Sequence, residues 1–420
     1  VMLENLWHTP KEKIEQKSVF WNMMSSGLNS VVSMFLLWIV TMINGVSDAG
    51  IFSLAFSTSQ MMLTIGNYGM RNYQATDIRN KYSTGVYLSS RIFTNAIMMS
   101  AVGIFVVAKG YYFEKSCITI LLCLLKATDA MDDIYGGFYQ KNGRLDVAGK
   151  MMTIRIAAYV ITFCISLVIT HNMIFSCCIA IATAGTVLVI LVQSTKSEFV
   201  LEKPIFNCKK IGELLKECLP LCISAFLLNY MGNAPKYAID TYMTSSEQAY
   251  YTYLFMPCFV TNLFVGFALQ PLLVRLSENW VKKHYSQFIK LCGVIFLASL
   301  IIATFVVVAG GWLGCPILSL VFGVSLQKYR KDLIILLIGG AFFAFAVIEQ
   351  VILTVMRKQV YLLLGFVLAS VTAFFVSNPL VKKMGLMGAG CAYSLSATVL
   401  FGVLGTMIVI FFIKEKGGRK

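Results

Sequence analysis

The sequence predicts an all-α, polytopic membrane protein with about twelve transmembrane helices in two six-helix lobes, and three observations support this fold class. First, 58% of the 420 residues are hydrophobic and only 13% are charged, whereas soluble domains carry about 25% charged residues. The mean hydropathy is accordingly high, at +0.75. Second, the apolar residues form long runs, and third, the second half of the chain partly repeats the first. Such a chain needs lipid as its solvent.

Each predicted span is an apolar run close to the length of about 20 residues with which a helix crosses a bilayer core. In chain order the runs are 18–40, 50–70, 87–108, 116–138, 151–169, 173–194, 213–233, 250–274, 288–309, 333–356, 360–378 and 386–413. We expect no cleavable signal peptide, because residues 1–17 are polar and lack a short apolar run with a cleavage site.

The orientation is predicted from the Lys and Arg residues between the spans, which favour the cytoplasmic side. If the N-terminus is inside, the inside segments contain most of these residues, for example Lys81, Lys141 and Lys209, and the outside segments contain few, such as Lys109 and Lys328. We therefore expect a multi-pass protein of the bacterial cytoplasmic membrane with both termini in the cytoplasm.

An internal repeat predicts the domain organisation. Residues 48–55 and 248–255 open the second and eighth spans with similar sequences, and residues 130–149 align with 346–365 at a similar offset. Six spans per half is an even number, so both halves insert in the same orientation, as parallel repeats. The predicted domains are an N-terminal lobe (1–195), a cytoplasmic linker (196–212) and a C-terminal lobe (213–420). Two such lobes suggest a central cavity and alternating access.

Composition argues against several function classes. The net charge of +15 is explained by topology, and no basic aromatic module indicates nucleic acid. The 12 cysteines lie mostly in apolar runs without a C-x-x-C pair, and His8, His171 and His284 are scattered, so we expect no metal site or disulfide framework. There is no P-loop, and we expect no cofactor.

Four loose motifs over nearly the whole chain resemble a known family. They are residues 49–55 (Ala-Gly-Ile-Phe-Ser-Leu-Ala), 233–240 (Asn-Ala-Pro-Lys-Tyr-Ala-Ile-Asp), 317–323 (Ile-Leu-Ser-Leu-Val-Phe-Gly) and 385–390 (Gly-Leu-Met-Gly-Ala-Gly). In these motifs the chain resembles the polysaccharide flippases, of O-antigen or teichoic-acid type, of the multidrug/oligosaccharidyl-lipid/polysaccharide exporter (MOP) superfamily. The resemblance implies a MATE-like fold.

The resemblance also implies a function. Such a protein moves a polyprenyl-diphosphate-linked oligosaccharide across the membrane for cell-surface polysaccharide biosynthesis, with membrane lipids and polysaccharide-assembly proteins as further partners. A cation-coupled drug or organic-cation antiporter of the same fold is the alternative. A membrane-embedded glycosyltransferase or polymerase is disfavoured, because the chain has no large soluble loop and no nucleophile-base arrangement. A scaffold without transport would leave the intramembrane charges unexplained, and we expect no enzyme activity.

Charges within the predicted spans are the main site candidates, because a charge at mid-helix costs at least about 2.5–3.5 kcal/mol and usually faces a cavity. Lys126, Asp129 and Asp133 are spaced i, i+3 and i+7 on one helical face, from which Asp132 is expected to point away. Arg155 lies early in the fifth span. One interpretation is a cationic site for the diphosphate. The other is self-pairing of Lys126 with Asp129 or Asp133, and snorkelling of Arg155 to the interface.

Further candidates lie near the ends of spans or in the second half. Arg71, Arg91 and Arg275 sit near cytoplasmic ends, where topology alone accounts for them unless they guide an anionic headgroup. Lys236 and Asp240 form either a surface pair or part of the site, and Glu349 is the repeat counterpart of Asp133. The complete prediction assigns substrate binding to Lys126, Arg155, Arg71, Arg91, Arg275 and Lys236, and coupling to H⁺ or Na⁺ to Asp129, Asp133, Asp240 and Glu349. Gly136-Gly137 and Gly339-Gly340 are expected to allow close helix packing.

Overall fold

The computed structural model describes residues 6–77 and 80–417, so residues 1–5, 78–79 and 418–420 lie outside it. Within the described residues all regular secondary structure is helical, which confirms the predicted all-α fold. The α-helices are α1 (Ile14–Asn44), α2 (Val46–Asn67), α3 (Met70–Thr76), α4 (Thr84–Lys109), α5 (Phe113–Lys141), α6 (Leu145–Thr170), α7 (Met173–Ser194), α8 (Cys208–Tyr242), α9 (Ser245–Val281), α10 (Tyr285–Phe322), α11 (Arg330–Val355) and α12 (Leu362–Gly417).

The predicted spans coincide with these helices. The range of α12 contains the last two spans, which a turn of the backbone at Gly385 (φ 62°, ψ −134°) separates. The short α3 was not predicted; it follows α2 after Tyr68 and Gly69, which both have left-handed backbone angles. Twelve apolar runs therefore give twelve helical spans, and α3 is an addition that packs against α5.

Composition separates the helices into two groups. Among the described residues, 7 helices are long and apolar enough to cross a membrane, namely those containing α1, α4, α6, α7, α10, α11 and α12. The remaining long helices, α2, α5, α8 and α9, also match predicted spans but are more polar. Because intramembrane polar residues face protein or water rather than lipid, the polar side chains of these helices are expected to point into the bundle.

The boundaries between helices follow from residues that can begin or end them. Gly45 (φ 93°) separates α1 from α2, and Gly110 (φ 64°) ends α4 in the left-handed conformation that glycine adopts without strain. A capping box begins α9: the amide of Glu247 donates to the hydroxyl of Thr244, and the Thr244 amide donates to the Glu247 carboxylate (2.9 Å). Local sequence thus determines where these spans start and stop.

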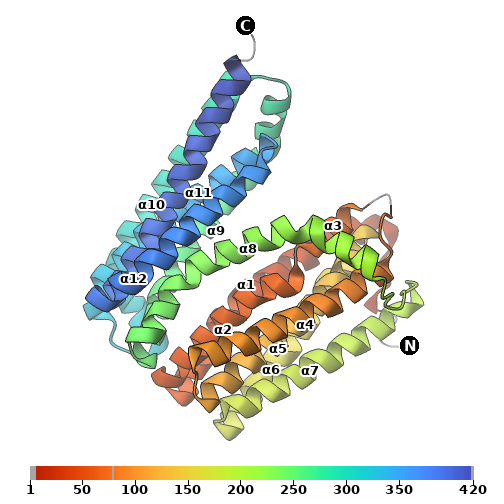
Figure 1. Cartoon of the computed structure of the whole chain (residues 1–420), viewed down its shortest axis with the longest axis horizontal. Coiled ribbons are helices and arrows are strands. Elements are labelled where there is room, and N and C mark those ends of the chain that lie inside the picture. Colours follow the sequence, from red (N-terminus) through yellow and green to blue (C-terminus); the bar gives the residue numbers. More distant parts are fainter. Residues whose placement is uncertain (1–5, 78–79, 418–420) are drawn as a thin grey trace. The chain divides into compact units, whose positions relative to one another are not determined.

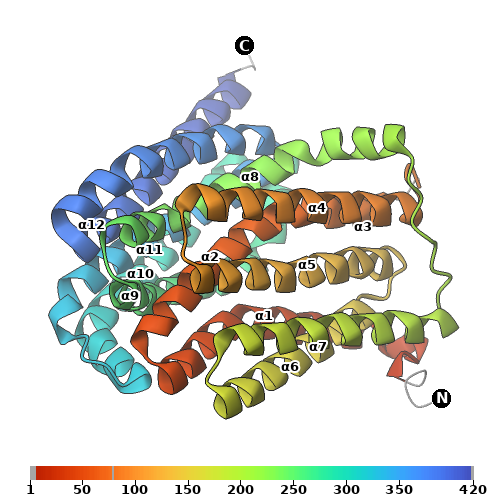
Figure 2. The same cartoon turned by 60° about the horizontal axis from the view of Figure 1, so that its bottom comes forward.

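The chain divides into two compact units, Val1–Phe226 and Leu227–Lys420, each with its own bundle of helices. In the first unit α1, α2 and α4 to α7 run side by side, and in the second unit α9 to α12 do so (Figures 1 and 2). The division falls inside α8, after the predicted linker (196–212). The first part of α8 therefore belongs to the first unit.

Polar contacts hold the linker and the start of α8 against the first unit. The Gly85 amide at the beginning of α4 donates to the Glu202 carboxylate (2.7 Å), which supplies an acceptor where helix amides lack one. On α8, Glu217 accepts hydrogen bonds from the Tyr73 hydroxyl and the Lys81 ammonium group. The linker thus packs along the end of the bundle rather than extending away from it.

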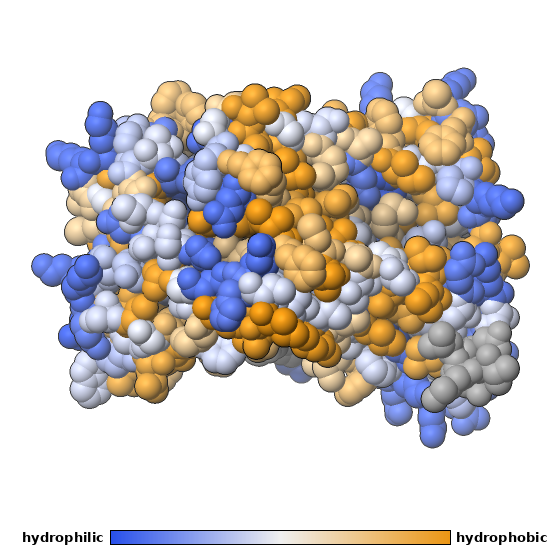
Figure 3. Space-filling model, turned by 90° about the horizontal axis from the view of Figure 1, so that it is seen from below, coloured by the Kyte–Doolittle hydropathy of each residue, from blue (hydrophilic) through white to orange (hydrophobic). Residues whose placement is uncertain are grey.

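Large apolar side chains cover much of the outer surface. Val107, Phe113 and Leu320 are each at least 80% exposed, and Figure 3 shows hydrophobic side chains over broad areas of the face in view. Soluble proteins rarely expose continuous apolar patches of this extent. The exposed apolar surface belongs to helices of membrane-spanning length, so the protein is a multi-pass membrane protein whose outer side chains contact lipid.

Glycine pairs bring helices close together, as predicted. A Cβ atom on Gly137 would lie 2.4 Å from Oε1 of Gln74, so α3 packs directly on α5 there. A Cβ atom on Gly340 would lie 3.0 Å from the Cβ atom of Cys258, so α11 packs closely on α9. Gly136 lies beside the guanidinium group of Arg71, and this close approach brings that arginine to the polar surface of α5.

Candidate functional site

A polar pocket of about 330 Å³ opens within the first unit, among α1, α2, α3, α5 and α6. Its polar lining contrasts with the apolar interior of the rest of the bundle. The lining residues are Asn22, Ser25, Ser26, Asn29, Ser30, Leu63, Asn67, Arg71, Asp129, Asp132, Asp133, Gly136, Ala148, Gly149, Met152 and Arg155. Three carboxylates and two guanidinium groups lie on one side of this pocket.

Arg155 joins α6 to α5 by pairing with two of the carboxylates. Its Nη1 atom lies 2.5 Å from Oδ1 of Asp129, and its Nη2 atom lies 3.2 Å from Oδ2 of Asp132. The Arg155 side chain is almost completely buried. Buried charges are tolerated when they are paired and hydrogen-bonded, and the planar fork of arginine can meet two carboxylates at once. Arg155 therefore holds Asp129 and Asp132 in fixed positions at the pocket.

Asp133 accepts from two arginines that come from different helices. Nη2 of Arg91, on α4, lies 2.9 Å from Oδ2, and Nη1 of Arg71, on α3, lies 3.3 Å from Oδ1. Arg91 is completely buried and also donates to the backbone carbonyl of Gly66 at the end of α2. Arg71 keeps 29% of its side-chain surface exposed. Asp133 thus has one partner inside the bundle, Arg91, and a second partner at the pocket surface, Arg71.

Lys126 lies deeper in the helix bundle. Its Nζ atom is 2.7 Å from Oδ2 of Asp129 and 4.9 Å from the ring centre of Phe56. The side chain is 1% exposed and does not line the pocket. The self-pairing of Lys126 with Asp129, one of the two interpretations of its sequence position, is the arrangement found.

The prediction that Asp132 points away from the charged face is wrong. Asp132 pairs with Arg155 and lines the same pocket as Asp129 and Asp133. Periodicity along α5 gives the directions of its own side chains but not the reach of a guanidinium group from α6.

The cluster contains four cations (Lys126, Arg71, Arg91, Arg155) and three anions (Asp129, Asp132, Asp133), so its formal charge is 4 − 3, or one net positive charge.

Sequence reasoning missed the polar residues of α1. Part of the pocket lining comes from α1, through Asn22, Ser25, Ser26, Asn29 and Ser30. They are spaced i, i+3, i+4, i+7 and i+8, which places them on one face of the helix. This spacing, in an otherwise apolar span, was the signal that could have revealed them.

The other predicted residues lie in the second unit. Lys236 on α8 is buried, with its Nζ atom 5.6 Å from the ring centre of Phe255, and Asp240 is partly buried one turn further along. Glu349 on α11 is buried beside Gly405, and its Oε2 atom has no hydrogen-bond partner among the described residues. Arg275 on α9 is exposed. These residues are not part of the cluster around Asp129.

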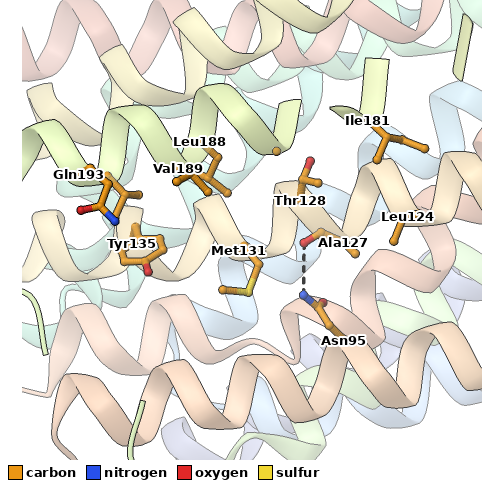
Figure 4. A pocket seen from close by; sticks show the side chains of 12 residues that line it. Asn95, Leu124, Ala127, Thr128, Met131, Tyr135, Ile181, Leu188, Val189 and Gln193 are labelled. Atoms are coloured by element: carbon orange, nitrogen blue, oxygen red, sulfur yellow. Dashed lines mark hydrogen bonds between the residues drawn. The ribbon is translucent and has the colours of Figure 1, made fainter. Parts of the chain in front are cut away.

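A second, larger cavity of about 460 Å³ lies on the other side of α5, between α4, α5 and α7. Figure 4 shows Leu124, Met131, Ile181, Leu188 and Val189 along it, and its lining is mainly apolar. The Asn95 amide donates to the carbonyl of Ala127 (3.2 Å) within it. α5 thus presents its carboxylates to the polar pocket and its apolar side chains to this groove, which suits hydrocarbon and not a charged group.

The described residues contain no group of three or more His, Cys, Asp or Glu side chains arranged to hold a metal ion. The polar pocket instead offers arginine side chains, neutral hydrogen-bonding groups and three carboxylates that are already paired with cations. Guanidinium groups bind phosphate or carboxylate oxygens with two parallel hydrogen bonds. The lining itself carries two guanidinium groups and three carboxylates, and Lys126 and Arg91, which pair with these carboxylates from outside the lining, bring the whole cluster to one net positive charge.

The whole chain is similar to several known proteins. No family model matches the chain. A capsular polysaccharide biosynthesis protein, CapF, of Staphylococcus aureus is 22% identical over 376 residues, which cover 89% of this chain and 93% of that protein. The chain is therefore similar over almost its full length to a protein of polysaccharide biosynthesis.

Solved structures of low sequence identity share the fold. An inward-facing multidrug resistance MATE family transporter of the MOP superfamily superposes with a TM-score of 0.70 at 12% identity, covering 100% of this chain and 99% of that chain. The lipid II flippase MurJ, in an inward closed conformation, superposes with a TM-score of 0.72 at 14% identity, covering 93% and 87%. The chain shares the fold of these two MOP superfamily transporters, and the resemblance that the sequence motifs indicated fits both these structures and the capsular polysaccharide biosynthesis protein.

Proposed function

We propose that this protein is a flippase that moves a polyprenyl-diphosphate-linked oligosaccharide across the membrane by alternating access. The observation that carries the proposal is that Arg71 and Arg155 line the polar pocket of the first unit while each carboxylate of the pocket already pairs with a cation. The similar capsular polysaccharide biosynthesis protein and the similar lipid II flippase support this substrate class. Membrane lipids and polysaccharide-assembly proteins are the proposed further partners.

Arg71 is the residue we expect to bind the diphosphate first. It shares Asp133 with Arg91, so it can move to a phosphate group while Asp133 keeps a cation. It is also the more exposed of the two arginines. Arg155 lines the pocket on the α6 side, and while its two Nη atoms stay paired with Asp129 and Asp132 its Nε–H, which has no partner among the described residues, can donate to the ligand. Arg71 can meet a diphosphate in the bidentate way that guanidinium groups favour.

A drug or organic-cation antiporter of the same fold is the second candidate. A cationic ligand needs a carboxylate that is available to it, but Asp129, Asp132 and Asp133 all pair with lysine or arginine. Displacing these partners would leave cations unpaired in the bundle, which is costly. The pairing of these carboxylates therefore favours an anionic ligand. A transferase or polymerase is disfavoured, because the pocket offers no nucleophile with an adjacent base.

The proposed location is the bacterial cytoplasmic membrane with both termini in the cytoplasm, which the distribution of Lys and Arg supports. Single cysteines placed at Lys11 and Lys414, in a background without other accessible cysteines, should not react with an impermeant thiol reagent in intact cells. They should react after the membrane is opened. Labelling of either position in intact cells would contradict this orientation.

Energy for transport can come from the membrane potential or from ion exchange. Moving an uncompensated negative charge outward across an inside-negative membrane releases about 2.3 kcal/mol per charge per 100 mV. For ion exchange, we propose Glu349 as the first candidate for the acid that binds H⁺ or Na⁺ and Asp133 as the second. Asp129 and Asp240 are the further candidates. Asp133 is held by two guanidinium groups, whereas Oε2 of Glu349 has no hydrogen-bond partner among the described residues.

The test is transport of a fluorescent polyprenyl-diphosphate-linked sugar in proteoliposomes, with potential, pH gradient and sodium gradient imposed separately. Arg71→Ala should lower the rate by about 10-fold or more, because a hydrogen bond to a charged group is worth about 1.5–3 kcal/mol. Its thermal stability should change little, because Arg71 is partly exposed and Asp133 keeps Arg91 as its buried partner. Lys382→Ala, which removes a cation outside the pocket, is the matched control.

Three outcomes decide between the alternatives. No transport by the wild-type protein under any gradient, together with transport of an organic cation, would replace the flippase by the antiporter. Wild-type rates in Arg71→Ala would remove that arginine from the substrate path. If Glu349→Gln and Asp133→Asn both keep the wild-type response to each gradient, neither acid is the coupling group and the potential alone drives the step.

A further inference from the structure

The five polar residues of α1 that line the pocket, Asn22, Ser25, Ser26, Asn29 and Ser30, form a stripe of neutral groups, here called the α1 stripe. The stripe contains amides and hydroxyls but no charge, whereas the arginines and carboxylates of the pocket come from α3, α5 and α6. One pocket thus combines a charged wall with a neutral, hydrogen-bonding wall.

The α1 stripe faces the pocket and not lipid. Asn22, Ser26 and Ser30 are exposed at one-turn intervals, and Met23 and Val31, about 100° around the helix, are exposed apolar residues at 67% and 56%. A polar face exposed to hydrocarbon is unfavourable, so such faces line water-filled cavities or contact a polar ligand. The two exposed faces of α1 therefore have different surroundings, lipid on one and the polar pocket on the other.

Hydrogen-bonding capacity remains unused on the α1 stripe. Ser30 donates to the carbonyl of Ser26 (2.8 Å) and Ser25 donates to the carbonyl of Asn22 (3.1 Å), which leaves both hydroxyl oxygens as acceptors. The side-chain amides of Asn22 and Asn29 make no hydrogen bond within the described residues. Each amide has two donor hydrogens and an acceptor oxygen. The stripe can therefore both donate to and accept from a ligand rich in hydroxyl groups.

We propose that the α1 stripe binds the sugar attached directly to the diphosphate, while Arg71 and Arg155, which line the same pocket from α3 and α6, bind the diphosphate itself. This inference rests on the proposed function and adds how the substrate is recognised. A sugar ring carries neutral groups that both donate and accept, and it is covalently adjacent to the phosphates, as the two walls of one pocket require. The volume of about 330 Å³ is at the lower end of ligand pockets, which begin near about 300 Å³, so it suits a headgroup and one sugar.

The experiment compares the binding of two probes to the purified full-length protein in nanodiscs. One probe is a short-chain polyprenyl diphosphate, and the other is the same lipid with one N-acetylhexosamine attached. Wild-type protein should bind the sugar-bearing probe about 10-fold more tightly, the equivalent of one or two net hydrogen bonds. The combined variant Asn22→Ala, Ser26→Ala, Asn29→Ala should lose this preference but keep its affinity for the probe without sugar.

Matched variants separate this inference from the proposed function. Ser33→Ala changes a serine of α1 that does not line the pocket and should keep the sugar preference. Arg71→Ala should weaken the binding of both probes by a similar factor. Alanine has the highest helix propensity, so the stripe variant should retain the fold, and an unchanged melting temperature checks this.

Each other outcome overturns a specific statement. If the stripe variant keeps the wild-type preference for the sugar-bearing probe, or if wild-type protein has no such preference, the α1 stripe does not recognise sugar and only hydrates the pocket. If wild-type protein binds neither probe, the proposed function fails and the inference fails with it. If only the sugar-bearing probe loses affinity in Arg71→Ala, the assignment of the two walls is wrong.

Discussion

Arg155→Ala should destabilise the first unit by about 3–5 kcal/mol, the usual cost of removing one partner of a buried ion pair, and should abolish transport. Asp129 would keep Lys126 as a partner, but Asp132 pairs only with Arg155 among the described residues. A carboxylate left without a cation inside the helix bundle is the physical cause of the loss. Thermal unfolding of the purified protein in detergent and transport in proteoliposomes measure the two effects.

A double substitution separates stability from function at this position. Arg155→Ala combined with Asp132→Asn removes the unpaired charge, so most of the lost stability should return. Transport should remain absent, because the pocket wall still lacks its guanidinium group. Asp132→Asn alone leaves Arg155 paired with Asp129 and serves as the control. Recovery of transport in the double variant would show that Arg155 supports the helices and does not bind substrate.

Arg91→Ala should also cost several kcal/mol of stability, although Asp133 keeps Arg71 as a partner. Arg91 is completely buried, and it ties Asp133 on α5 to the carbonyl of Gly66 and the side chain of Asn67 at the end of α2. Removing it leaves a cavity, and large-to-small changes in a core typically cost about 2–5 kcal/mol. The expected result is a strongly lowered melting temperature and reduced protein level.

Lysine should not replace Arg91. A lysine offers one compact ammonium group, whereas Arg91 uses both ends of a planar fork to reach Asp133 and the end of α2 together. Arg91→Lys should therefore remain unstable, while Arg71→Lys, at the exposed partner of the same carboxylate, should have nearly wild-type stability. A stable Arg91→Ala variant with weakened binding of the polyprenyl diphosphate would instead make Arg91 a substrate residue.

The sequence alone determined the spans and their order. Lipid requires continuous apolar runs, and the positions of these runs predicted the helices, including the two spans joined in α12. The adjacent glycines also predicted correctly that Gly136 and Gly137 would allow close packing. Charges inside apolar runs are rare because they are costly in lipid, so the sequence by itself indicated Lys126, Asp129 and Arg155 as site candidates.

Only the tertiary structure decided how these charges pair. The partners of Asp133 come from α3 and α4, and the partner of Asp132 comes from α6. Periodicity gives the direction of a side chain around its own helix, but the rotation and packing distance of a neighbouring helix decide which group it meets. The same reason applies to the polar residues of α1: five neutral side chains signify a site only when charged groups of other helices line the same pocket.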